Sequence, residues 1–113
     1  MKADEVILAL GALAHESRLA TFRLLVRRGP DGHTPGELTQ RLGVPAPTMS
    51  FHLRELVRAG LVESRREGRF LYYSAAFGRM RSLIEFLTDK CCSLADTGCG
   101  EGCRPASTAK ARS

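Results

Sequence analysis

Residues 34–60 read TPGELTQRLGVPAPTMSFHLRELVRAG, and this stretch decides the fold expected of the chain. Thr34 can cap a helix, Pro35 suits the first helical position and Glu37 can reach back to the cap, which together make a capping box. Gly43 is typical of the residue that ends a helix. The sequence therefore predicts a short helix between this cap and this glycine.

A second helix is expected over residues 47–59, after the short linker VPAP. Its large apolar residues fall on one face at helical spacing, namely Met49, Leu53, Leu56 and Val57. Gly60 ends it. Two short helices joined by a tight turn that contains glycine are typical of a helix-turn-helix.

The residues that follow predict a β-hairpin. LVESRRE (residues 61–67) and RFLYYSA (residues 69–75) are rich in Val, Leu, Phe and Tyr, and they meet at a turn formed by Glu67 and Gly68. A basic hairpin after a helix-turn-helix is a wing. The expected fold is therefore mainly α with a β-hairpin wing (α+β), a winged helix-turn-helix.

Three further helices are expected around this motif. Their apolar residues recur at helical spacing: Val6, Ile7, Leu10, Leu13 and Ala14 in a first helix, Leu19, Phe22, Leu25 and Val26 in a second, and Phe77, Met80, Leu83, Ile84 and Leu87 in a last. The second helix is expected to begin near Glu16 or Ser17. The glycines and prolines of residues 27–36 predict a loop after it.

Composition and charge narrow the class of protein. The chain has 113 residues, of which 43% are hydrophobic and 26% charged, as in a globular domain. A net charge of +5 favours an anionic partner, nucleic acid first. No apolar run reaches the length of about 18 residues that spans a membrane, and early charged residues argue against a signal peptide. We therefore expect a cytoplasmic protein.

All four cysteines lie in residues 89–103, DKCCSLADTGCGEGC. In a reducing compartment, clustered cysteines more often bind metals or take part in redox chemistry than form structural disulfides. Thiolates are soft ligands, but the adjacent Cys91 and Cys92 lack the gap that tetrahedral zinc sites usually have. Arsenite needs only three thiolates, and the glycines between the cysteines allow a third to fold back.

The helix-turn-helix, the wing and the cysteines together resemble the ArsR family of bacterial winged-helix metalloregulators. The resemblance rests on LGALAHESRLATFRLLV, on residues 34–75 and on the terminal cysteines, and it covers roughly residues 8–103. It implies a homodimer built from the first and last helices, which binds double-stranded operator DNA and releases it on metal binding. The chain looks most like the arsenite-responsive repressors whose ligands lie beyond the last helix.

Two sensing sites found elsewhere in the family are missing. The helix expected after Thr34 contains no cysteine, and residues 77–90 contain no histidine. The expected inducer is As(III), with Sb(III) as a further candidate, and no structural cofactor is expected. Cys91, Cys92 and Cys99 are the predicted ligands. Cys103 is the alternate third ligand, because its longer loop costs well under ~1 kcal/mol more to close.

The second helix of the helix-turn-helix is expected to read DNA through Thr48 and Phe51 on its exposed face and through Ser50, His52 and Arg54 on the flanks of that face. Phe51 leaves two interpretations open, since its ring could press against a thymine methyl group or cover the edge of the core. The wing is expected to contact phosphates or the minor groove through Arg65, Arg66 and Arg69.

We therefore divide the chain into a winged helix-turn-helix DNA-binding and dimerisation domain (1–90), a cysteine-rich inducer-binding segment (91–103) and a flexible tail (104–113). The predicted function is an arsenite-responsive transcriptional repressor. The alternative is a repressor that senses thiol oxidation or persulfides with the same cysteines. An enzyme is not expected, because no Gly-rich oxyanion loop precedes the cysteine pair and the pair follows an apolar helix.

Overall fold

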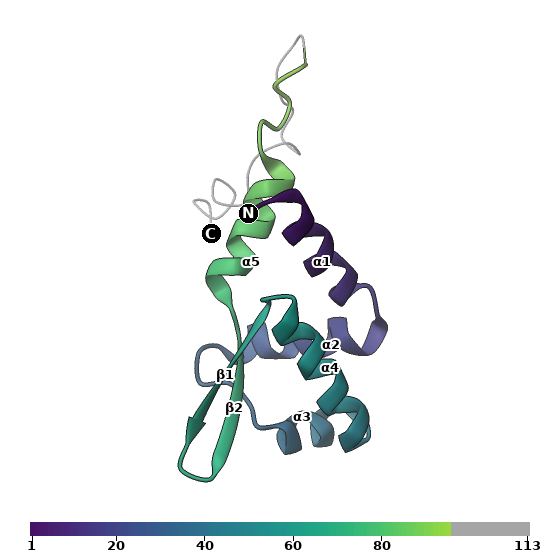
Figure 1. Cartoon of the computed structure of the whole chain (residues 1–113), viewed down its shortest axis with the longest axis vertical. Coiled ribbons are helices and arrows are strands. Elements are labelled where there is room, and N and C mark those ends of the chain that lie inside the picture. Colours follow the sequence, from purple (N-terminus) through teal and green to yellow (C-terminus); the bar gives the residue numbers. More distant parts are fainter. Residues whose placement is uncertain (96–113) are drawn as a thin grey trace.

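A computed structural model describes residues 1–95 and confirms the winged helix-turn-helix (Figure 1). The described part contains five helices and one antiparallel two-stranded sheet, in the order α1 (Ala3–Leu13), α2 (Glu16–Arg28), α3 (Pro35–Leu42), α4 (Ala46–Arg58), β1 (Val62–Glu67), β2 (Phe70–Ala75) and α5 (Phe77–Thr88). The hairpin projects from one end of the molecule, and α5 lies with α1 at the other.

The helix-turn-helix forms where the capping signals predict it. The Thr34 hydroxyl oxygen accepts the backbone N–H of Glu37 (3.2 Å), and the Glu37 carboxylate accepts the backbone N–H of Thr34 (2.9 Å). This second hydrogen bond is the main reason why the pKa of Glu37 lies below its usual value. Gly43 ends α3 in the left-handed conformation, with φ of 69°. The next helix begins at Ala46, one residue earlier than predicted.

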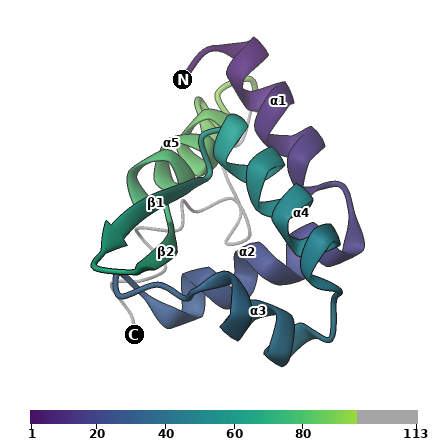
Figure 2. The same cartoon turned by 60° about the horizontal axis from the view of Figure 1, so that its bottom comes forward.

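The core lies where α4 packs against α1, α2 and α3 (Figure 2). Its buried apolar side chains include Val6, Ala9, Phe22, Leu25, Leu38, Met49, Leu53, Leu56, Leu61 and Leu83. The prediction that Val57 belongs to this face was wrong, because 39% of the residue is exposed. Val57 lies at the margin of the face and lines a hollow between α4 and the hairpin.

The apolar stripes of α1 and α5 are only partly covered. Each helix was predicted correctly, but several of its apolar residues stay exposed: Ile7, Leu8 and Leu10 in α1, and Ile84, Phe86 and Leu87 in α5. An ion pair of 3.7 Å between Arg79 and Glu5 links the two helices. No element within residues 1–95 covers these side chains. No helix within residues 1–95 has the length and apolar character needed to cross a membrane.

The loop between α2 and α3 pairs with the wing, which the sequence did not reveal. His33 and Tyr73 exchange both backbone hydrogen bonds, at 2.9 and 2.8 Å, in an isolated antiparallel bridge. The preceding residue, Gly32, has a positive φ of 75°, and a Cβ atom placed there would lie 2.4 Å from the carbonyl oxygen of Tyr73. Both the backbone conformation and the close approach of β2 therefore require glycine.

We expect Gly32→Ala to lower the free energy of unfolding by roughly 3 kcal/mol, since the new methyl group adds a backbone clash to the strain of positive φ. Urea unfolding followed by circular dichroism measures the loss. Gly43→Ala is the matched control, because Gly43 also has positive φ but nothing lies within 4 Å of its Cβ position. Its expected loss is about 1 kcal/mol. Equal losses would contradict the importance of the Tyr73 contact.

Candidate DNA interface and cysteine pair

The exposed face of α4 carries polar and aromatic side chains. Thr48, Ser50, Phe51 and Arg54 are all exposed, as the helical periodicity of the sequence predicts. They lie in the first two-thirds of the helix, and the residues of a recognition helix that reach base edges are those near its start. Their accessibility is therefore suited to DNA contact.

Phe51 lies between two arginine side chains. The guanidinium carbon of Arg18, from α2, is 6.0 Å from the ring centroid of Phe51, and that of Arg54 is 5.8 Å away. Both distances are within the range of cation–π attraction. Because 45% of Phe51 is exposed, the ring is held at the surface by these neighbours and does not close over the core.

His52 is buried, contrary to the flank position predicted for it. Only 3% of the residue is exposed, and its ring centroid lies 4.8 Å from that of His15. Its Nδ1 is 3.5 Å from Arg18 Nη1, and its buried Nε2 has no hydrogen-bond partner among the described residues. His52 follows Met49 by three positions, so it falls on the core stripe of α4. Its position makes it a packing residue and does not support direct DNA contact.

The surroundings of His52 keep its ring neutral. Burial lowers the pKa of His52 below its ordinary value, and the charges of His15 and Arg18 lower it further. A neutral imidazole next to a guanidinium avoids placing two positive charges together in the interior. α4 is therefore packed on the α1–α2 corner through a ring that carries no charge at neutral pH.

Arg65, one of the three arginines of the wing, joins the hairpin to the α2–α3 loop. Arg65 donates from Nη1 to the carbonyl oxygen of Pro30 (3.2 Å), from Nη2 to that of Asp31 (3.0 Å) and from Nε to the Glu67 carboxylate (2.8 Å). Its guanidinium carbon also lies 5.1 Å from the ring centroid of Tyr72. A phosphate contact by Arg65, as predicted, would compete with these interactions, so its position supports an anchoring role.

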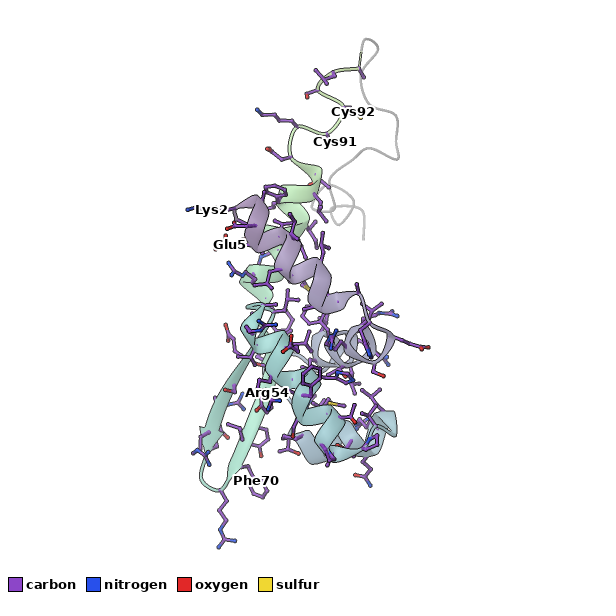
Figure 3. All side chains as sticks on the ribbon, turned by 45° about the vertical axis from the view of Figure 1, so that its right-hand side comes forward. Lys2, Glu5, Arg54, Phe70, Cys91 and Cys92 are labelled. Carbon is purple, nitrogen blue, oxygen red and sulfur yellow. The ribbon has the colours of Figure 1, made fainter. Side chains whose placement is uncertain are left out.

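The other two arginines of the wing are accessible. Arg66 and Arg69 are exposed, and neither forms an ion pair or side-chain hydrogen bond within residues 1–95. Figure 3 shows Phe70 at the far end of the hairpin, next in sequence to Arg69. The tip of the wing therefore presents two cationic side chains and an exposed aromatic ring.

A hollow of about 350 Å³ separates α4 from the hairpin; it is lined by Pro35, Ser50, Leu53, Arg54, Val57, Ser64 and Tyr73. In Figure 3, Arg54 lies on the side of α4 that is turned toward the hairpin. Pro35 places the N-terminus of α3 at the same hollow, and helix N-termini favour negative charge. The hollow thus joins the recognition helix, the wing and a helix N-terminus into one surface suited to a phosphate strand.

Cys91 and Cys92 follow α5 in a series of tight turns. The N–H of Cys91 donates to the carbonyl oxygen of Thr88 (3.0 Å), and both Lys90 and Cys92 have positive φ, of 57° and 62°. The two Sγ atoms are 3.7 Å apart. Cys91 is exposed and Cys92 is half-buried. The chain therefore brings two sulfur atoms together at the exit of the last helix, at the opposite end of the molecule from Phe70 (Figure 3).

The remaining predicted ligands, Cys99 and Cys103, lie outside the described residues. Within residues 1–95, no three His, Cys, Asp or Glu side chains gather in a way that could hold a metal ion. The ligand set of Cys91, Cys92 and Cys99, with Cys103 as alternate, stays a prediction, as do the domain boundaries at residues 90 and 103.

Comparisons with known proteins identify the family. A family model described as a helix-turn-helix domain matches residues 13–65. The biofilm growth-associated repressor of Agrobacterium fabrum is 36% identical over 86 residues, which are 76% of this chain and 71% of that relative. The solution structure of a homodimeric winged helix-turn-helix domain from Mycobacterium bovis, titled a possible ArsR-family transcriptional regulator, aligns with a TM-score of 0.61 and 32% identity, over 77% of this chain and 81% of the other. The chain belongs to the ArsR family.

Membership in the ArsR family makes the chain a DNA-binding transcriptional regulator of the winged-helix kind and confirms the resemblance to the family. The likeness to its arsenite-responsive members stays a prediction. A more distant relative is the probable mercury resistance operon repressor of Streptomyces lividans, which is 34% identical over 73 residues, or 65% of this chain and 56% of that protein. These relatives are regulators of transcription and not enzymes.

No local pattern in the sequence indicates the contacts that Arg18 makes in this ArsR-family regulator. Arg18 lies 34 positions before His52, and nothing local links it to the recognition helix. The role of Arg65 was equally hidden, because its acceptors are backbone carbonyl groups of the α2–α3 loop. Both residues act through partners that only the folded chain brings near.

Proposed function

We propose that the protein is a repressor that binds operator DNA as a homodimer and releases it when As(III), or Sb(III), is captured by cysteine thiolates beyond α5. The observation that carries the proposal is the Cys91–Cys92 pair, whose sulfur atoms are 3.7 Å apart at the end of that helix. Thiolates at this spacing can share one soft ion. The mercury-related name of one relative supports an inducer of this thiophilic class.

The residues proposed to contact DNA are those members of the predicted set that are exposed in the structure. Thr48, Ser50 and Arg54 supply hydrogen bonds from α4, and Phe51 supplies an apolar surface that suits a thymine methyl group. The wing adds Arg66 and Arg69 as phosphate contacts, which raise affinity more than specificity. His52 and Arg65 do not contact DNA in this proposal. His52 packs α4 against His15, and Arg65 fixes the hairpin to the α2–α3 loop.

The proposed dimer interface is formed by the apolar faces of α1 and α5. Their exposed aliphatic and aromatic side chains form an uncovered apolar surface that a second copy of the chain can bury. A small domain also gains stability from dimerisation, because it buries a limited core alone. The homodimeric state of the Mycobacterium bovis relative supports the same assembly here.

On the inducer side, a third thiolate is needed to complete a trigonal arsenite site, and Cys99 is the proposed donor with Cys103 as its alternate. Because the cysteine pair directly follows α5, drawing three sulfur atoms together changes the end of a helix proposed to form the dimer interface. Such a change weakens DNA binding only if the arsenic-bound state disfavours the dimer arrangement that fits DNA.

The same two cysteines support a second candidate, a repressor that responds to oxidants or persulfides. Their sulfur atoms lie 3.7 Å apart, next to the cationic Lys90, and thiol–disulfide exchange proceeds by attack of one sulfur atom on another. Adding arsenite under reducing conditions and an inorganic polysulfide in a separate titration distinguishes the two. Release by polysulfide alone would favour this second candidate.

The DNA interface can be tested by fluorescence anisotropy with a duplex from the promoter region of the protein's own gene. We expect Arg54→Ala to weaken binding by roughly 10- to 100-fold, because Arg54 faces the hollow between the two DNA-contacting elements. Arg23→Ala removes the same charge from an exposed position on α2 and is expected to have little effect. Equal losses for both variants would show that net charge, and not this surface, determines binding.

A further inference from the structure

Arg18 touches three different parts of the molecule. Its Nε donates to the carbonyl oxygen of Ala12 in the last turn of α1 (2.8 Å). Its Nη1 lies 3.5 Å from Nδ1 of His52, and its guanidinium carbon lies 6.0 Å from the ring centroid of Phe51. A planar guanidinium can donate along its edge while its face meets an aromatic ring, which an ammonium group cannot do. One side chain of α2 thus connects the end of α1 with two successive residues of the recognition helix.

The neighbouring histidine strengthens the same junction. The Nδ1 atom of His15 accepts the backbone N–H of Ser17 (3.2 Å) and so caps α2, while its ring packs against His52. The His52 and Phe51 rings are in turn 6.1 Å apart. The α1–α2 corner, the buried ring and the exposed ring therefore form one continuous set of contacts that ends at the DNA-facing surface.

We propose that Arg18 is a positioning residue for DNA recognition, which holds the Phe51 ring at the exposed face of α4 against the end of α1. Phe51 has an exposed ring and no covalent constraint beyond its own backbone, so its direction depends on the two flanking guanidinium groups. Arg54 moves with the same helix as Phe51. Of the two guanidinium contacts, the one from Arg18 comes from another helix and therefore relates the ring to the rest of the domain.

This inference rests on the proposed function, because it assumes that Phe51 meets DNA. It also gives α1 a second part in that function. If α1 forms part of the dimer interface, a change in the arrangement of the two copies reaches the Phe51 ring through Ala12 and Arg18, without passing through the wing.

A double-mutant cycle tests the proposal, with operator affinity measured by fluorescence anisotropy. Arg18→Gln is expected to weaken binding roughly 10-fold in the wild-type background and less than about 2-fold in a Phe51→Ala background, because the ring is then no longer there to position. The slope of log affinity against log salt should not change. Equal losses in both backgrounds, or a slope lower by about 1, would overturn the proposal, since the latter means a direct phosphate contact.

Two further variants test whether the effect is specific to Arg18 and to its planar guanidinium group. Arg23→Gln removes an exposed arginine from the same helix and should bind like wild type. Arg18→Lys keeps the charge but loses the planar fork, so we expect it to behave like Arg18→Gln; wild-type affinity in Arg18→Lys would overturn the proposal. Thermal unfolding confirms that each variant is folded, and if Arg18→Gln is not, Arg18→Lys takes its place in the cycle.

A measurement without DNA separates this inference from the proposed function. The ring-proton NMR shifts of Phe51 in the free protein should change in the Arg18 variant and stay unchanged in Arg23→Gln. Unchanged Phe51 shifts in the Arg18 variant would overturn the positioning role even if the protein binds its operator. Failure of the wild-type protein to bind any promoter duplex, with the Phe51 shifts changed as expected, would instead overturn the DNA-binding proposal alone.

Discussion

Leu87→Glu is expected to convert the protein from a dimer to a monomer and to weaken operator binding by at least about 100-fold. Leu87 is 57% exposed on α5, so a glutamate there does not disturb the core of the single chain. In a two-fold symmetric dimer the substitution occurs twice, and each carboxylate would be buried without a partner in an apolar interface. A monomer presents only one recognition helix and loses the second half-site of the operator.

Sedimentation velocity measures the oligomeric state, and anisotropy measures operator affinity on the same samples. Ala20→Glu is the matched control, because it adds the same charge at an exposed position of α2. It should remain dimeric. A Leu87→Glu protein that stays dimeric and binds DNA normally would exclude α5 from the interface.

Cys91→Ser and Cys92→Ser are each expected to bind operator like wild type and to keep it when arsenite is added. The cysteine pair lies at the opposite end of the molecule from the tip of the wing, so neither thiol is placed to touch DNA (Figure 3). In wild type, arsenite should lower operator affinity by about 5- to 150-fold, the usual range of coupling between two sites. Either serine variant leaves only two of the three proposed ligands, Cys91, Cys92 and Cys99, and two thiolates hold the ion poorly. Anisotropy titrations with arsenite under reducing conditions measure the difference.

The same titration identifies the third ligand. Cys99→Ser should fail to respond and Cys103→Ser should respond like wild type, because Cys99 needs the shorter loop to reach the pair. The reverse pattern would assign Cys103 as the ligand. A normal response in all four single variants would show that the cysteines are not the switch.

The separation of the cysteine pair from the recognition helix bears on how such a switch can act. Ion capture at the exit of α5 can reach DNA only by changing the arrangement of the two copies or the α1–α2 corner on which α4 packs. Two elements of this route are visible in a single chain: the Arg79–Glu5 ion pair between α5 and α1, and the Arg18 contact with the end of α1. An inducer can act along this route only if it binds two arrangements of these contacts with different affinity.

The sequence by itself determined the elements of the fold and the exposed face of α4 that is proposed to contact DNA. The Thr34 capping box and the left-handed Gly43 depend on residues within one helical turn, so they can be recognised without knowing the rest of the chain. The exposure of Thr48, Ser50 and Arg54 follows from the 3.6-residue period of the helix once its apolar face is known. The cysteine cluster is visible as spacing alone.

Only the tertiary structure decided which polar side chains are engaged by other parts of the chain. His52 and Arg65 were both expected at the DNA surface, but His52 packs on His15 and Arg65 donates to the α2–α3 loop. The partners lie more than 30 positions away, and a side chain's hydrogen bonds depend on distances in space and not on spacing along the chain. The tertiary structure also decided that the apolar faces of α1 and α5 stay exposed. Periodicity marks a face as apolar, but whether the chain covers it or leaves it for another molecule depends on how all the helices pack.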